Sequence, residues 1–212
     1  MAGLSDHLPE GFEIPETPSD RPEFWSAFWR ASVTPWDLGT AHPEFLRQRD
    51  RLGPTGRALV AGCGRGHDAY FLASIGFSVL AIDCVPEAAA FARERLQGLK
   101  AEVRCMDAFE LDEGPSFDLV LEHTFLCALP LERRPDWADL MRRHLRPGGR
   151  LVALVFPVGK PASDGGPPFG LTTDQIADLL AGDFELVHEE VAHSESPARG
   201  SGERFAVFQR RD

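Results

Sequence analysis

The chain has 212 residues, of which 43% are hydrophobic and 26% charged, values that suit one globular domain with a substantial core. It carries 22 basic and 33 acidic residues, a formal net charge of −11, and this excess of acid argues against a nucleic-acid partner. The longest apolar run, Leu151 to Val158, is too short to span a bilayer, and no secretory signal is visible. We expect a cytoplasmic protein that binds neither nucleic acid nor membrane.

The first quarter of the chain predicts an arm and two short helices. Residues 1–21 are rich in Pro, Glu and Asp and predict a flexible arm. Phe24–Arg30 and His42–Arg51 predict helices, because a Pro a few residues further on closes each of them. We expect residues 22–212 to form a single domain, in which residues 22–52 are an N-terminal helical cap.

Strands and helices then alternate. The expected strands are Ala58–Ala61, Ser78–Ile82, Glu102–Cys105, Phe117–Leu121 and Arg150–Phe156. The expected helices are one that follows the first strand and ends at Ile75, and three more, from Pro86 to Gly98, from Pro135 to Leu145 and from Thr172 to Leu180. A long loop, Pro157–Gly170, precedes the last helix, and Phe184–Val191 and Arg204–Arg210 alternate like an antiparallel pair. This order predicts an α/β, doubly wound, mostly parallel sheet of seven strands with a C-terminal antiparallel hairpin.

The segment from Arg57 to Asp83 carries the clearest functional signal. Gly62, Gly64 and Gly66 follow a strand and open a helix, so a ligand can lie against the main chain at the helix N-terminus. Asp83, about 20 residues further on, ends the next strand, where such folds present a carboxylate to ribose hydroxyls. These residues predict a nucleoside-cofactor site rather than an ordinary turn.

The spacing of the glycines bears on the identity of the cofactor. A dinucleotide fingerprint would place its third small residue at position 67, but the chain has His67 there and its extra glycine one place earlier, at Gly66. This spacing disfavours a nicotinamide oxidoreductase. Two classes of protein nevertheless remain as alternatives. One is a nicotinamide oxidoreductase, and the other is a binding protein that carries the cofactor fold without catalysis.

Six short motifs occur together in one order. They are W-x-x-x-W at Trp25 and Trp29, T-P-W-D-x-G at Thr34 to Gly39, G-C-G-x-G-x-D at Gly62 to Asp68, D-A-F at Asp107 to Phe109, P-G-G at Pro147 to Gly149, and G-P-P-F at Gly166 to Phe169. With them the chain resembles, from about Phe24 to its end, the Rossmann-like class I S-adenosylmethionine-dependent methyltransferases. More narrowly, it resembles the thiopurine, thiol and halide methyltransferase family, and its intact T-P-W-D-x-G matches the thiol/halide branch best.

The resemblance implies S-adenosyl-L-methionine as the cofactor, S-adenosyl-L-homocysteine as the product, and no metal. The residues it implies for cofactor binding are Trp25, Trp29, Trp36, Gly62, Cys63, Gly64, Asp83, Cys84, Asp107, Ala108, Phe109, Glu122 and His123. Aromatic faces attract a sulfonium cation, which supports the role of the three tryptophans, although tryptophans often simply pack a core. Trp137, in the middle of a predicted helix, is expected in the core.

The implied reaction is in-line methyl transfer to a small thiol, or to a halide or thiopurine-like acceptor. Its implied substrate-binding residues are Trp36, Phe125, Arg134 and Phe169, and its implied catalytic residues are His123 and Arg134. A soft anion needs alignment and desolvation more than a base, so His123 is either a base or simply a packed histidine, and Arg134 can equally be a solvated charge. The alternative is a small-molecule O- or N-methyltransferase with His123 or Glu122 as base.

Cysteine usage and ligand spacing complete the expectations. Cys63, Cys84, Cys105 and Cys127 lie in or beside predicted strands without any C-x-x-C pair, which favours buried, reduced thiols. No His, Cys, Asp or Glu spacing suggests a metal site. We expect a monomer or a weak homo-oligomer that acts on a small molecule.

Overall fold

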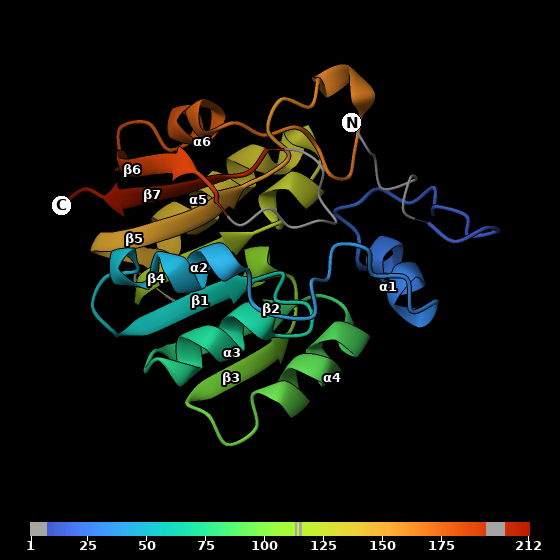
Figure 1. The fold of residues 1–212 in the computed structure, drawn as a ribbon, viewed down its shortest axis with the longest axis horizontal. Coiled ribbons are helices and arrows are strands. Elements are labelled where there is room, and N and C mark those ends of the chain that lie inside the picture. Colours follow the sequence, from blue (N-terminus) through green and yellow to red (C-terminus); the bar gives the residue numbers. More distant parts are fainter. Residues whose placement is uncertain (1–7, 113, 115, 194–201) are drawn as a thin grey trace.

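The computed structural model describes residues 8–112, 114, 116–193 and 202–212 and places seven strands in one sheet (Figure 1). The strands are β1 (Arg57–Ala61), β2 (Ser78–Asp83), β3 (Ala101–Cys105), β4 (Phe117–His123), β5 (Leu145–Val155), β6 (Phe184–Val191) and β7 (Arg204–Arg210). Their order is β3-β2-β1-β4-β5-β7-β6; the first five are parallel, and β7 is antiparallel to both β5 and β6. The predicted doubly wound sheet with a C-terminal hairpin is confirmed.

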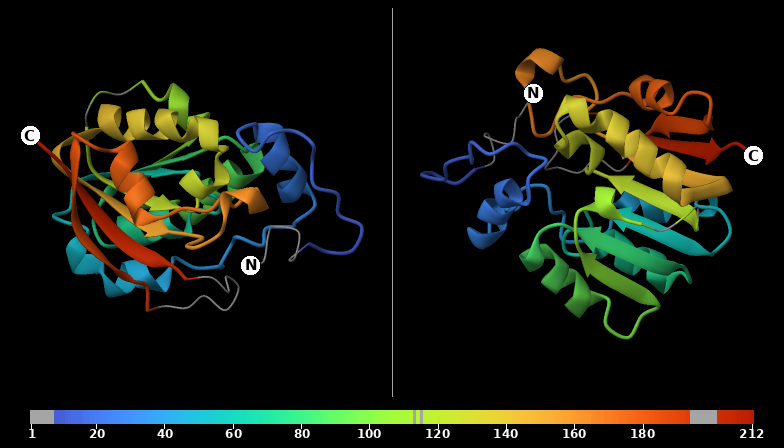
Figure 2. Two further views of the ribbon diagram at one scale, coloured as in Figure 1. Left: turned by 90° about the horizontal axis from the view of Figure 1, so that it is seen from above. Right: turned by 180° about the vertical axis from the view of Figure 1, so that it is seen from behind.

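Helices cover both faces of this sheet. They are α1 (Pro22–Arg30), α2 (Pro43–Arg47), α3 (His67–Ser74), α4 (Pro86–Arg95), α5 (Arg134–His144) and α6 (Thr173–Leu179), with short 3-10 turns η2 (Arg49–Arg51), η3 (Ala108–Glu110), η4 (Leu126–Ala128), η5 (Leu131–Arg133) and η6 (Ala162–Asp164). The helices α2, α3 and α4 lie on one face and α5 and α6 on the other, while α1 lies beyond the carboxyl ends of the parallel strands (Figures 1 and 2). This position of α1 covers the edge where such sheets bind ligands.

The core follows the alternation of side chains along each strand. In β4, Leu119 and Leu121 pack with residues of α2 and α3, whereas Val120 packs with residues of α5 and α6 on the opposite face. Trp137 of α5 is fully buried in the second of these clusters, so its predicted core position is confirmed. The same alternation decides which of two neighbouring polar residues at the end of β4 reaches the ligand edge.

Two predicted boundaries differ from the structure. The helix expected over 42–51 is divided into α2 and η2, because the chain tightens at Gln48, whose carbonyl accepts the N–H of Arg51 across a 3-10 turn. Residues 146–149, which separate the expected helix from the expected strand, lie inside β5, which begins directly after α5 at Leu145 and shifts its register against β4 before Arg150. An irregularity in the pairing of β4 with β5 therefore takes the place of a separate connection between the helix and the strand.

The four cysteines are free thiols, but they are less buried than the sequence predicts. Cys127 is buried, Cys63 and Cys84 are half-buried, and Cys105 is exposed because it ends β3, at the edge of the sheet. The expectation of four buried thiols is therefore wrong for Cys105.

Part of the predicted arm contacts the domain. The Phe12 ring lies 4.8 Å from that of Phe28 in α1, and the Ser19 hydroxyl donates to the Ala128 carbonyl. Residues 1–7 lie outside the described residues, and the mobility of the arm stays a prediction. Within the described part of the chain, no helix has the length and apolar character needed to cross a membrane.

Candidate functional site

A cavity opens at the carboxyl ends of the parallel strands, and residues of α1 and of the segment that follows it also line this cavity. One wall, which we call the β1–β2 side, consists of the loop 62–66 together with the ends of β2 and β3. The other wall, the β4–β5 side, consists of residues 123–125 and 127–129, Phe156 and Pro167–Pro168. Most of the predicted site residues line this cavity: Trp25, Trp29, Trp36, Gly62, Cys63, Gly64, Asp83, Cys84, Asp107, Ala108, Phe109, His123 and Phe125. The structure therefore brings together segments that are up to about a hundred residues apart.

The loop after β1 presents its main chain to the cavity. Gly62 and Gly64 have φ values of 64° and 52°, in the left-handed region that favours glycine. A Cβ added to Gly62 would lie 2.9 Å from a ring carbon of Phe125, closer than such atoms approach. Residues larger than glycine are thus excluded at Gly62, and the loop presents main chain rather than side chains to the cavity.

Asp83 fastens this loop to the end of β2. Its carboxylate accepts the N–H of Gly64 at 2.8 Å and that of Val85 at 2.9 Å. Burial raises the pKa of Asp83 to about 6, although these two backbone hydrogen bonds act in the opposite direction. The carboxylate is 8% exposed and lines the cavity, so a ligand hydroxyl there would meet an acceptor already oriented by the backbone.

The thiols of the β1–β2 side are kept protonated. Burial, reinforced by the charge of Asp83, raises the pKa of Cys63 well above its ordinary value and that of Cys84 to about 12. Because the thiolate is the nucleophilic form of cysteine, these two side chains are poor nucleophiles at neutral pH. A reactive electrophile bound in the cavity would therefore not be consumed by the wall beside it.

The end of β3 adds an aromatic corner to the same side. Asp107 accepts the N–H of Phe109 at 2.9 Å and so begins the 3-10 turn η3. The Phe109 ring lies 5.9 Å from that of Phe125, and the guanidinium of Arg133 lies over it, 4.6 Å from its centre. Arg133 also pairs with Asp20 at 2.8 Å, which ties the end of the arm, just before α1, to this corner.

Three tryptophans of the cap face the cavity. The rings of Trp25 and Trp36 meet edge to face at 5.2 Å, and those of Trp29 and Trp36 lie 6.5 Å apart. Trp29 also packs with Val85 and Ala88 at the start of α4. The tryptophans therefore pack against one another and also line the cavity. The two roles that the sequence suggested for them, packing and contact with a cofactor, are compatible.

An ion pair that the sequence did not single out joins the cap to the glycine loop. Asp37, the acid of T-P-W-D-x-G, lies 2.6 Å from Nε of Arg65 and 3.3 Å from Nε2 of His67. The Arg65 guanidinium in turn lies 5.0 Å from the centre of the Trp29 ring. The motifs T-P-W-D-x-G and G-C-G-x-G-x-D are thus in direct contact. Their presence in one sequence did not by itself show this contact.

The end of β4 separates two residues that the sequence treats together. His123 lines the cavity, and its Nδ1 lies 2.6 Å from Oδ2 of Asp68. Glu122 points to the opposite face, where it is 4% exposed and accepts the N–H groups of Phe125 and Leu126 and the indole N–H of Trp137. Burial raises the pKa of Glu122 to about 7. Glu122 is not among the residues that line the cavity, because neighbouring strand residues face opposite ways, and its position does not support the predicted cofactor contact.

Two further predicted residues do not line the cavity. Arg134, at the start of α5, is 8% exposed and donates through Nη2 to the Gly170 carbonyl at 2.7 Å. The Phe169 ring packs on the backbone of Gly166, and its N–H donates to the Cys127 carbonyl at 2.7 Å. Pro167 and Pro168 line the cavity in place of Phe169, so Arg134 and Phe169 hold the loop 157–170 in position from behind.

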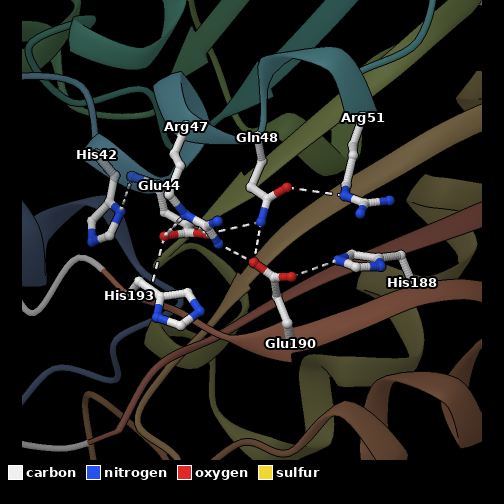
Figure 3. A network of polar contacts seen from close by, with 8 residues as sticks. All are labelled: His42, Glu44, Arg47, Gln48, Arg51, His188, Glu190 and His193. Carbon is white, nitrogen blue, oxygen red and sulfur yellow. Dashed lines mark hydrogen bonds and ion pairs between the residues drawn. The ribbon is translucent and has the colours of Figure 1, made fainter.

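A polar network anchors α2, which supports the β4–β5 side (Figure 3). Glu44 is fully buried and accepts the side chains of Arg47 and Gln48 and the backbone N–H of His193. Arg47 and Gln48 both also contact Glu190 of β6. Burial opposes the charge on Glu44, yet its hydrogen bonds lower its pKa overall, so an ionised carboxylate fixes α2 to the C-terminal hairpin.

Comparison with known proteins places this site in a family. The family model described as thiopurine S-methyltransferase matches residues 20–206. The chain belongs to this family. It is 33% identical to thiocyanate methyltransferase 1 of Arabidopsis thaliana over 88% of this chain and 84% of that protein, and 35% identical to probable thiol methyltransferase 2 of the same plant over 74% and 70%.

A solved structure supports the fold. The 1,6-didemethyltoxoflavin-N1-methyltransferase of Burkholderia thailandensis, with bound S-adenosylhomocysteine, superposes with a TM-score of 0.76 at 22% identity, covering 95% of this chain and 94% of that one. The protein is thus an S-adenosylmethionine-dependent methyltransferase of the thiopurine S-methyltransferase family, with a class I fold. The nicotinamide and non-catalytic alternatives are set aside. Among the described residues, no three His, Cys, Asp or Glu side chains are grouped to hold a metal ion, and metal independence stays a prediction.

Proposed function

We propose that this family member methylates the sulfur of a small thiol or of a thiol-like anion such as thiocyanate. The observation that carries this proposal is the apolar character of the β4–β5 side, whose walls include Leu129, Phe156, Pro167 and Pro168. A hard, strongly hydrated acceptor loses many hydrogen bonds on entering such a chamber, whereas a soft, weakly hydrated one loses few. Two relatives in the family are named for thiocyanate and thiol acceptors, which supports the same class.

The β1–β2 side fits the cofactor that the family uses. Its glycine loop lines the cavity with the main chain of Gly62 and Gly64, and Asp83 offers a carboxylate to ribose hydroxyls. We assign the nucleoside to this side, with Asp107, Ala108 and Phe109 beside the base, Cys63 and Cys84 along the wall, and Trp25, Trp29 and Trp36 above the charged sulfur. When bound, S-adenosylmethionine supplies an electrophilic methyl group on a sulfonium sulfur.

The chain's own residues then orient and desolvate the acceptor. Trp36 and Phe125 reach the cavity directly, whereas Arg134 acts through the loop that it holds at Gly170. The pair Asp37–Arg65 holds the cap, and the pair Asp20–Arg133 holds the end of the arm, against the cavity, which excludes water from the reacting atoms. Alignment of this kind accounts for most of the acceleration expected for a soft nucleophile.

The remaining expectations belong to the same proposal. We propose a single domain over 22–212 with its cap at 22–52, a cytoplasmic location, a monomer or weak homo-oligomer, and no nucleic-acid or membrane partner. The free thiols suit a reducing compartment, and the net charge of −11 suits neither a phosphate backbone nor an anionic membrane surface.

A panel of acceptors tests the function. The protein is incubated with S-adenosylmethionine and, separately, with a thiol, thiocyanate, iodide, a phenol and an amine, and the methylated products are identified by mass spectrometry. We expect methylation of the sulfur acceptors, with iodide slower. Turnover restricted to the phenol or the amine would instead establish the O- or N-methyltransferase alternative.

A further inference from the structure

The ion pair between Asp37 and Arg65 joins the cap to the glycine loop inside the cavity itself. Oδ2 of Asp37 lies 2.6 Å from Nε of Arg65, and the two side chains are only 14% and 26% exposed. Both residues line the cavity that we assign to the cofactor. A half-buried pair of this kind is screened less by water and salt than a pair on the surface, so it can hold two segments together.

The Asp37 carboxylate is itself held in one orientation. Its Oδ1 accepts the backbone N–H of Gly39 at 2.8 Å and lies 3.3 Å from Nε2 of His67. Burial and the charge of Arg95 lower the pKa of His67, so this ring is mostly neutral at pH 7. Arg65 is therefore the cation that balances the charge of Asp37.

The guanidinium of Arg65 lies over two aromatic rings, one in the cap and one in α4. It is 5.0 Å from the centre of the Trp29 ring and 4.1 Å from that of the Phe91 ring, and the two rings are 6.0 Å apart. A Cβ added to Gly64 would lie 3.9 Å from the Trp29 ring, so this ring also reaches the glycine loop. Arg65 thus fixes the Trp29 ring relative to the loop.

One ion pair in this way orients two of the cavity's tryptophans. Asp37 fixes the backbone directly after Trp36, Arg65 holds the ring of Trp29, and the two rings lie 6.5 Å apart. Attraction between a cation and an aromatic ring depends on where the cation lies relative to the ring face. S-adenosylmethionine has a cationic sulfur, whereas S-adenosylhomocysteine has a neutral thioether. A change in the ring positions therefore affects the binding of these two ligands differently.

We propose that the Asp37–Arg65 pair positions Trp29 and Trp36 so that the site favours the cationic donor over its neutral product. The two charged residues are positioning residues, because they act through the rings. The inference rests on the proposed placement of the charged sulfur beneath the tryptophans, and it does not depend on which acceptor is methylated. Because the attracted charge disappears on methyl transfer, this arrangement favours release of the product.

Calorimetric titration with S-adenosylmethionine and with S-adenosylhomocysteine, in the absence of any acceptor, tests the inference. The quantity compared is the ratio of Kd for the product to Kd for the donor. We expect Asp37→Asn and Arg65→Met each to lower this ratio by about tenfold, the scale of a cation–π contact. The double variant should lower it no further, because either substitution already breaks the pair.

The ion pair between Arg30 and Glu87 supplies the matched control. Nε of Arg30 in α1 lies 3.1 Å from Glu87 in α4, so this pair also ties the cap to the domain, but neither residue lines the cavity. Arg30→Met and Glu87→Gln should therefore leave the ratio within about twofold of the parent value.

Two results in variants that keep the circular dichroism of the parent would overturn the inference alone. If Asp37→Asn weakens both ligands by the same factor, the pair is only a structural anchor. If Asp37→Asn lowers the ratio but Arg65→Met raises it, the two charges act on the sulfonium directly and not through the rings.

The proposed function fails in different measurements. If neither Trp29→Leu nor Trp36→Leu changes the ratio, the proposed placement of the sulfur is wrong, and the inference is wrong with it. A parent that methylates only the phenol or the amine of the acceptor panel contradicts the proposed acceptor and leaves the inference standing.

Discussion

The two sides of the cavity are built in different ways. On the β1–β2 side, the surface is main chain: Gly62 and Gly64 take left-handed conformations, and Asp83 binds backbone N–H groups 2 and 19 residues away. On the β4–β5 side, the surface depends on side chains from distant segments, such as Asp68 with His123, 55 residues apart, and Ser19 with Ala128, 109 apart.

This difference predicts which side tolerates variation. A main-chain surface is specified by a few residues with special backbone angles, and it suits a cofactor that does not change. A surface made of side chains from several loops can be altered by single substitutions without disturbing the sheet, and it suits an acceptor that differs between enzymes. The predictions below test this contrast, starting with the largest effect.

The largest effect is expected at the glycine loop. Gly62→Ala forces an L-residue to φ 64° and places its Cβ 2.9 Å from the Phe125 ring, so both the loop and the aromatic wall must shift. We expect the affinity for S-adenosylhomocysteine to fall by more than about 100-fold, roughly 3 kcal/mol, measured by calorimetry. Gly98→Ala is the control, because Gly98 has φ 79° but nothing within 4 Å of its Cβ. Equal losses in both variants would mean that the loop surface is not the binding surface.

A smaller effect is expected at Asp83, and it depends on pH. Its pKa is about 6, so the carboxylate is ionised at pH 7.5 and largely protonated at pH 5. An ionised carboxylate accepts hydrogen bonds from two hydroxyls, and we therefore expect parent affinity for S-adenosylhomocysteine to fall as pH decreases through 6. Asp83→Asn should bind about 2 kcal/mol more weakly than the parent at pH 7.5 and show a flatter pH profile. Parallel profiles for the two proteins would place the nucleoside elsewhere.

Glu122 offers a test that concerns stability rather than binding. Its pKa is about 7 in the folded protein against an ordinary 4.5, so the folded state holds the proton more tightly than the unfolded state. The associated stability is present below about pH 4.5 and is lost as pH rises through 7. Relative to Glu122→Gln, the parent should therefore lose about 2–3 kcal/mol of unfolding free energy between pH 5 and 8, measured by urea denaturation.

The same variant decides whether Glu122 takes part in catalysis. Because Glu122 faces α5 and not the cavity, a folded Glu122→Gln protein should keep its affinity for S-adenosylhomocysteine and its turnover of thiols. Loss of turnover without loss of stability would restore the sequence-based interpretation of Glu122 as a base.

The contrast between the two sides also describes what the sequence could predict. The order of elements, the hairpin at the C-terminus and the glycine loop follow from local patterns, namely apolar periodicity and glycines at fixed spacing, and the fold confirms them. The pairing of Asp68 with His123 was not predicted, although both positions were visible as the last residue of a motif and the end of a strand. Their proximity depends on β4 lying beside β1, which only the strand order reveals.

Side-chain direction was the second limit. Glu122 and His123 are adjacent in sequence, and period-two alternation indicates that they face opposite ways, but it does not say which of them faces the ligand. Arg134 and Phe169 lie in segments that do border the cavity, yet each is turned toward the backbone of the loop 157–170. Motif matching located these segments and could not resolve the directions of single side chains.

The smallest effect is expected at Arg134, where the sequence-based and structural interpretations differ. Nη2 of Arg134 donates to the Gly170 carbonyl, so Arg134→Ala should loosen the loop that carries Pro167 and Pro168. We expect KM for a neutral thiol and for thiocyanate to rise by a similar factor, about fivefold or 1 kcal/mol, with unchanged cofactor affinity, because a wall rather than a charge is lost. Arg142→Ala, which removes another α5 arginine that bonds a backbone carbonyl away from the cavity, is the control. If Arg134→Ala impairs the methylation of thiocyanate alone, the guanidinium acts on the anion directly. The β4–β5 side then recognises the charge of the acceptor as well as its shape.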